Sequence, residues 1–116
     1  MNILITGAGG FVGTHLCKNL IREHNIIGIV RSKNQKQALE KVCRIKTYVA
    51  DLSKPFEIDD KIDVVIHGAA RSPNPGIPIN NYIYDNIITT QNLIHFSTKK
   101  KVRLFIYLSA ISVFGS

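Results

Sequence analysis

The 116-residue sequence contains no apolar run that approaches the length of a membrane span, and no basic and apolar leader precedes its first predicted strand. It has only two cysteines, Cys17 and Cys43, whose spacing fits neither a disulfide framework nor a metal site. Internal repeats and low-complexity segments are lacking as well. These absences predict one soluble, cytoplasmic domain with no membrane partner and no metal, in which both cysteines are buried as small apolar residues.

Acidic residues are scarce beside basic ones: 8 aspartates and glutamates stand against 15 lysines and arginines, for a formal net charge of +7. Such a balance can indicate nucleic-acid binding. The basic residues are spread along the chain, however, and the single run, from Lys99 to Lys101, has no interleaved aromatic residues. It falls where a helix is expected to end, and lysines there complement the carbonyl end of the helix dipole. We therefore favour a solvated helix end over a nucleic-acid surface.

Short apolar runs typical of buried strands alternate along the chain with longer stretches of helical spacing. The predicted strands are Ile3–Ile5, Ile26–Val30, Ile45–Ala50, Ile62–His67 and Val102–Leu108. The predicted helices run from Phe11 to about Arg22, from Gln35 to about Cys43, and from Asn80 or Asn81 to about Lys99. Such alternation favours a parallel sheet with right-handed crossovers. We expect an α/β fold, a doubly wound sheet of five strands in the order 3-2-1-4-5, with a ligand crevice at the carboxyl ends of the first and fourth strands.

Polar residues indicate where two of these helices begin. Ser32 or Asn34 is expected to cap the second helix, and Asn80 or Asn81 the third. The third helix is expected to bury one apolar face. The residues of that face are Ile83, Ile87, Leu93, Ile94 and Phe96.

The feature with the clearest functional meaning is the glycine-rich turn between the first strand and the first helix. Gly7 allows the chain to turn sharply off the strand, Gly10 lets backbone N–H groups approach a diphosphate, and Gly13 lets the helix lie against the strand. The helix N-terminus supplies unpaired N–H groups and about half a positive charge. The alternative is a flexible glycine-rich loop without a ligand. The strand before the turn and the helix after it favour a dinucleotide site.

The segment from Thr6 to Gly13 resembles the TGxxGFxG signature of the extended short-chain dehydrogenase/reductases. This family comprises epimerases, dehydratases and reductases that act largely on nucleotide sugars. The resemblance implies a Rossmann-type domain that binds NAD or NADP. It also implies that Phe11 and Val12 hold the diphosphate together with the three glycines.

Arg31 follows the second predicted strand, about twenty residues past the glycine turn, where an acid would hold the ribose hydroxyls of NAD. An arginine there can pair with the 2′-phosphate of NADP instead. The sequence therefore predicts NADP in preference to NAD. The alternative is an arginine that only stacks on the adenine.

Other segments resemble the parts of the family that surround the cofactor. Asp51 and Leu52 match a pair that lines the adenine pocket, although Asp51 could instead begin a turn. His67 to Ala70 resembles the HxAA segment. Small side chains at Ala69 and Ala70 would line the path of the dinucleotide.

Three residues near this segment have further roles under the resemblance. His67 is expected to be structural rather than catalytic. Arg71 could reach a phosphate or the substrate. Asn86 matches the asparagine of the NxxGTxNLL pattern, and we expect it to bond a loop, although Thr89 replaces the glycine of that pattern.

The segment after the fifth strand departs from the family pattern. Ala110 occupies the position of the catalytic Ser or Thr, and Phe114 replaces a tyrosine that is not the catalytic one. Ser109 and Ser112 flank the position and are the remaining catalytic candidates. The Tyr-x-x-x-Lys pair that supplies acid/base chemistry in the family is missing from the 116 residues.

The chain therefore looks like the N-terminal, incomplete part of a longer protein, truncated after the fifth strand, with the substrate and catalytic part absent. The sheet near Val102–Leu108 should be exposed unless a partner covers it, and a second copy of the chain is one such partner. We expect the NAD(P)-binding portion of a nucleotide-sugar epimerase, dehydratase or reductase, inactive alone. The alternative is a non-catalytic dinucleotide sensor of the same fold, which Ala110 favours.

Overall fold

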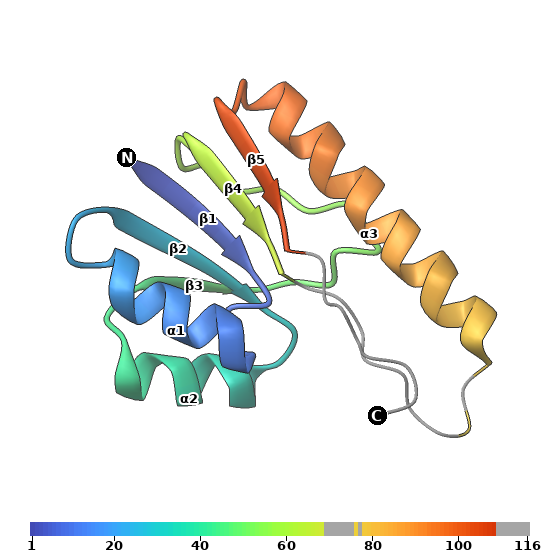
Figure 1. The fold of residues 1–116 in the computed structure, drawn as a ribbon, viewed down its shortest axis with the longest axis horizontal. Helices are drawn as coiled ribbons and strands as arrows, with labels where there is room; N and C mark the ends of the chain where they lie inside the picture. Colours follow the sequence, from blue (N-terminus) through green and yellow to red (C-terminus); the bar gives the residue numbers. More distant parts are fainter. Residues whose placement is uncertain (69–75, 77, 109–116) are drawn as a thin grey trace.

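A five-stranded parallel sheet forms the centre of the computed structural model, which describes residues 1–68, 76 and 78–108. The strand order is β3-β2-β1-β4-β5, and each neighbouring pair is parallel (Figure 1). The strands are β1 (Asn2–Thr6), β2 (Asn25–Val30), β3 (Lys46–Val49), β4 (Val64–His67) and β5 (Leu104–Tyr107). The helices are α1 (Phe11–Leu20), α2 (Lys33–Val42) and α3 (Ile79–Lys99). The predicted fold class and strand order are confirmed.

Helices α2 and α3 have different kinds of N-cap. Ser32 caps α2, since its Oγ accepts a hydrogen bond from the backbone N–H of Gln35 at 3.2 Å. The helix α3 has Pro78 at its N-cap with no side-chain cap, so the prediction of an asparagine cap was wrong. The backbone N–H of Asn81 donates to the Pro78 carbonyl at 3.0 Å, which places both candidate asparagines inside the first turn.

The sheet separates two apolar layers, because successive strand residues point to opposite faces. Helices α1 and α2 cover one face and α3 covers the other (Figure 1). On the first face Cys17 of α1 and Leu39 of α2 pack with Ile3 and Ile5 of β1. On the second face Leu93 and Phe96 of α3 pack with the alternate strand residues. Those strand residues are Leu4, Ile27, Ile29 and Val65.

Both cysteines are free and buried, as the sequence predicts. Burial raises the pKa of the Cys17 thiol to about 12, and it also raises the pKa of Cys43. Neither side chain is therefore a reactive thiolate at neutral pH.

The apolar face of α3 is narrower than predicted. Leu93 and Phe96 are buried, but Ile83, Ile87 and Ile94 are 53%, 50% and 48% exposed. The helix lies alone on its side of the described sheet, so residues on its flanks have no neighbouring helix to pack against (Figure 1). Periodicity identified apolar positions correctly but could not show whether another element covers them.

Strand β5 is the second place where apolar side chains face solvent. Leu104, Ile106 and Tyr107 are 53%, 37% and 50% exposed. Only β4 pairs with β5 among the described strands. The expectation of a bare surface at the fifth strand is therefore confirmed for the described residues.

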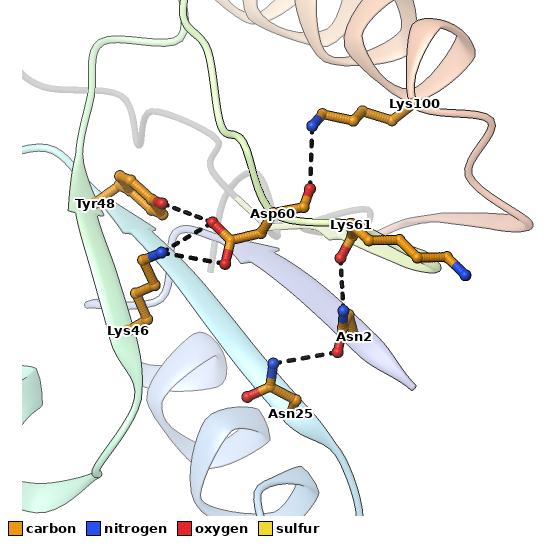
Figure 2. A network of polar contacts seen from close by, with 7 residues as sticks. All are labelled: Asn2, Asn25, Lys46, Tyr48, Asp60, Lys61 and Lys100. Atoms are coloured by element: carbon orange, nitrogen blue, oxygen red, sulfur yellow. Dashed lines mark hydrogen bonds and ion pairs between the residues drawn. The ribbon is translucent and has the colours of Figure 1, made fainter.

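At the amino edge of the sheet, Asp60 connects three parts of the chain (Figure 2). Its carboxylate accepts hydrogen bonds from the Tyr48 hydroxyl at 2.7 Å and from Lys46 Nζ at 3.1 and 3.2 Å. Its backbone carbonyl accepts one from Lys100 Nζ, at the end of α3, at 3.1 Å. The bonds from Tyr48 and Lys46 lower the pKa of the Asp60 carboxyl. The long connection between β3 and β4, which has no helix, is thus fastened to β3 and α3.

No helix in the described part of the chain has both the length and the apolar character needed to cross a membrane. Within the same residues, His, Cys, Asp and Glu side chains form no group of three or more that could hold a metal ion.

Candidate functional site

The glycine turn forms a tight bend between β1 and α1, at the carboxyl edge of the sheet. Gly7 has a φ of 67°, a left-handed conformation that glycine adopts at little cost. The backbone N–H of Gly10 donates to the Gly7 carbonyl at 3.0 Å and closes the bend. A Cβ at Gly13 would overlap the Gly7 carbonyl and lie 2.9 Å from Cα of Ala8. Helix α1 therefore approaches the strand as closely as the sequence predicts.

The first turn of α1 is open to solvent. Gly10 is the N-cap and offers no side-chain cap, and the first turn contains no acidic residue. Phe11 and Val12 are 82% and 57% exposed. Unpaired N–H groups at this helix end are suited to an anion.

Contacts with strand β2 hold the bend in place. The Ala8 backbone N–H donates to the Ile29 carbonyl at 3.2 Å, and the Thr14 hydroxyl donates to the Ala8 carbonyl at 3.0 Å. A Cβ at Gly28 would lie 3.0 Å from Cβ of Ala8. Gly28 was not assigned a role from the sequence, although a glycine inside a strand is a signal of close approach.

Arg31 follows β2 directly and is exposed. Its backbone N–H donates to Gln35 Oε1 at 2.9 Å. A Cβ at Gly9 would lie 3.3 Å from Cβ of Gln35. Gln35 thus packs against the glycine turn and fixes the backbone of Arg31, a role that sequence reasoning missed.

Arg31 shares a pocket of about 250 Å³ with residues from two other elements. The residues lining it among those described are Arg31, Asp51, Ser53, Asp85 and Thr89. Asp51 begins a turn, since its Oδ1 accepts from the Ser53 backbone N–H at 3.0 Å and from the Ser53 hydroxyl at 2.6 Å. These two bonds lower the pKa of Asp51, with smaller effects from the charges of Lys54 and Arg31. The turn that the sequence offers as the alternative for Asp51 is present, and Asp51 also lines the pocket.

Leu52 is buried in the core beneath α3 rather than at the surface. Its carbonyl accepts a hydrogen bond from Asn92 Nδ2 at 2.8 Å. Asn92 therefore fastens α3 to the loop after β3. The loop-bonding role of Asn86 stays a prediction; this residue is partly buried and lines a shallow hollow of about 500 Å³ beside Thr90 and Tyr107.

His67 closes β4 next to the glycine turn and is 2% exposed. Its Nδ1 lies 2.7 Å from the Thr6 hydroxyl, and its Nε2 lies 3.1 Å from the Thr90 hydroxyl. The Thr6 hydroxyl also accepts from the Gly68 backbone N–H at 3.0 Å. Burial lowers the pKa of His67. The ring joins the ends of β1 and β4 to α3, although from the sequence it had no evident partner.

The structure brings most of the described candidates to one edge of the sheet. The residues at or beside the bend and the neighbouring pocket are Gly7, Gly10, Phe11, Val12, Gly13, Arg31 and Asp51. The candidates Ala69, Ala70, Arg71, Ser109 and Ser112 lie outside the described residues, as do Ala110 and Phe114. The edge therefore combines an open helix N-terminus with a pocket that holds an arginine and carboxylates.

Known proteins are similar to this chain in sequence and in fold. The chain is 31% identical over 137 residues to the uncharacterized UDP-glucose epimerase YtcB of Bacillus subtilis (strain 168), with 99% of this chain and 42% of that protein covered. The structure of UDP-glucuronic acid 4-epimerase from Bacillus cereus in complex with NAD is similar at a TM-score of 0.74 and 32% identity. That match covers 100% of this chain and 42% of the other.

A third comparison concerns the fold alone. Yeast methylglyoxal/isovaleraldehyde reductase Gre2, solved with NADPH, matches at a TM-score of 0.76 and 20% identity. The match covers 92% of this chain and 36% of that chain. The chain thus spans well under half the length of these proteins. The pattern of the NAD dependent epimerase/dehydratase family matches residues 3–116, and the chain belongs to that family.

Proposed function

We propose that this chain is the dinucleotide-binding portion of a nucleotide-sugar epimerase, dehydratase or reductase, and that it binds NADP in preference to NAD. The observation that carries the proposal is the bend at Gly7, which opens α1 toward solvent with Gly13 packed against the strand. The diphosphate would lie against the first N–H groups of α1. Gly10, Phe11 and Val12 would border it.

The cofactor preference rests on Arg31. Arg31 follows the last residue of β2, the position that contacts the 2′ group of the adenosine ribose in folds of this type. Arginine binds phosphate in a bidentate manner and carries a permanent charge. Asp51 would accept from the adenine amine, and Leu52 would support the ring from the core.

Catalysis is not expected from residues 1–116 alone. They contain no Tyr-x-x-x-Lys pair, and Ala110 occupies the position where the resembled family has its Ser or Thr. Ser109 and Ser112 remain the candidates to replace that hydroxyl. The expected result with NADP and a nucleotide sugar is binding without turnover, and turnover by this chain would contradict the proposal.

The test of binding is calorimetric titration of the 116-residue chain with NADP and with NAD. Arg31→Ala should weaken NADP binding about tenfold and leave NAD nearly unchanged, since only NADP carries the phosphate. Arg22→Ala, which removes an exposed arginine beyond the far end of α1, is the matched control and should change neither affinity. Tighter binding of NAD than of NADP to the unmodified chain would end the NADP preference.

Ala110 also favours a second function, a sensor that binds the dinucleotide without catalysis. Both functions expect the same binding site in this chain. They differ in the sequence of the longer protein: a Tyr-x-x-x-Lys pair downstream of residue 116 supports the enzyme, and its absence there supports the sensor.

A further inference from the structure

Among the described residues that line the pocket of Arg31, negative charge exceeds positive charge. Arg31 comes from the end of β2, Asp51 from the turn after β3, and Asp85 from α3. Ser53 and Thr89 add two hydroxyl groups. One guanidinium and two carboxylates give these side chains a formal charge of −1, so Arg31 does not act alone on a ligand in this pocket.

We propose that Asp85 is a specificity-determining residue that opposes Arg31 and keeps NAD acceptable to a site whose arginine favours NADP. The inference rests on the proposed function, because it concerns the adenosine ribose of the same dinucleotide. In folds of this type the acid that accepts from the ribose hydroxyls follows the second strand. Here that position is Arg31, and an acidic residue of α3, Asp85, lines the same pocket instead.

The physical reason is the difference between a hydroxyl and a phosphate at the 2′ position. A carboxylate accepts a hydrogen bond from a hydroxyl, whereas a phosphate monoester brings close to two negative charges and no comparable donor. Arg31 attracts the phosphate, and a carboxylate in the same pocket repels it. The ratio of NADP affinity to NAD affinity therefore depends on the positive charge of Arg31 and on the negative charge of the carboxylate.

The charge of Arg31 already acts on one carboxylate of this pocket, that of Asp51. It contributes to the lowered pKa of Asp51, after the two hydrogen bonds from Ser53 and the charge of Lys54. The Oδ1 atom of Asp51 is engaged in its own turn, so changing Asp51 would alter the loop as well as the charge. Asp85 is partly buried on α3 and is the acid through which the charge can be changed with the Asp51 turn left in place.

The experiment compares Asp85→Asn with the unmodified chain by calorimetric titration with NAD and with NADP at low and at physiological salt. The ratio of NADP affinity to NAD affinity should rise about fivefold in the variant, and the rise should shrink as salt screens the pocket. Asp59→Asn removes one negative charge from an exposed acid next to Asp60, at the opposite edge of the sheet. It should change the ratio by less than about twofold.

Circular dichroism of each variant establishes that it is folded, and Asp85→Ala serves as a second variant if the amide perturbs α3. A ratio that stays the same in folded Asp85 variants, with both nucleotides still bound, overturns this inference and leaves the proposed function standing. Failure of the unmodified chain to bind either nucleotide overturns both.

Discussion

The carbonyl oxygen of Gly7 occupies the space that a Cβ atom at Gly13 would need. A methyl group there would also lie 2.9 Å from Cα of Ala8, and both obstacles are backbone atoms that cannot rotate away. Gly13→Ala should therefore push α1 off the sheet and lower the free energy of unfolding by about 3 kcal/mol. Urea unfolding followed by circular dichroism measures the change.

The neighbouring Gly10→Ala is the matched control for this prediction. Its φ of −79° suits any residue, and its Cβ would lie at an ordinary 3.4 Å from the Gly7 oxygen. The variant should fold nearly as stably as the unmodified chain but bind the dinucleotide more weakly, because the methyl group stands where the diphosphate would approach. Equal stability losses in both variants would show that the close contact at Gly13 has no special importance.

The buried ring of His67 predicts a loss of stability in mild acid. Burial lowers its pKa in the folded chain, whereas the unfolded chain titrates near the ordinary value of about 6.5. Below that pH the unfolded state binds more protons than the folded state, so the free energy of unfolding falls as the pH decreases. Urea unfolding between about pH 7.5 and pH 5 should show this slope.

His67→Gln should flatten that slope, since it removes the titrating group. It should also lower stability at pH 7.5 by about 1–3 kcal/mol, because the contacts with Thr6 and Thr90 are altered in a buried site. His95→Gln changes an exposed histidine of α3 and should retain the slope. A slope that persists in His67→Gln would assign the acid sensitivity to another group.

Some contacts at the candidate site can be predicted from the sequence, and others cannot. The glycine turn was predictable, because its spacing, the strand before it and the helix after it are local. The partners of His67 were not, since Thr6 and Thr90 lie 61 and 23 residues away. Asp85 enters the pocket of Arg31 only because α3 crosses the second face of the sheet, which no short-range pattern reveals.

The lack of long-range information in the sequence also explains why the buried face of α3 was predicted too wide. Helical spacing marked Ile83 and Ile87 as apolar positions, but burial also needs a neighbouring element, and the described residues provide none there. Leu93 and Phe96 are buried because they face the sheet directly. Strand order, by contrast, follows from the alternation of strands and helices together with the handedness of the crossovers, so it was predictable.

Asp60 provides a test of how the long connection is held. Asp60→Asn removes the charge that Lys46 and the Tyr48 hydroxyl contact, so the melting temperature at pH 7 should fall by a few degrees. The pKa of the carboxyl is lowered in the folded chain, so its contribution is present above the unfolded value of about 3.9 and is lost as the pH falls through the folded pKa. The difference between the two proteins should therefore shrink in strong acid. Asp59→Asn removes the charge of the exposed neighbouring acid and leaves the contacts of Asp60 with Lys46 and Tyr48 in place, so this control should melt like the unmodified chain.

The surface of β5 predicts self-association of the 116-residue chain. Leu104 and Ile106 share one face of the strand and are 53% and 37% exposed, and β4 is the single strand paired with β5 in the described sheet. Apolar side chains beside an open strand edge promote association at micromolar concentrations and above. Sedimentation velocity should show oligomers that decrease when both residues are replaced by lysine. Val42→Lys, at an exposed apolar position at the end of α2, should leave association unchanged. A chain that sediments as a monomer throughout a concentration series would mean that this surface is tolerated in water without a covering partner.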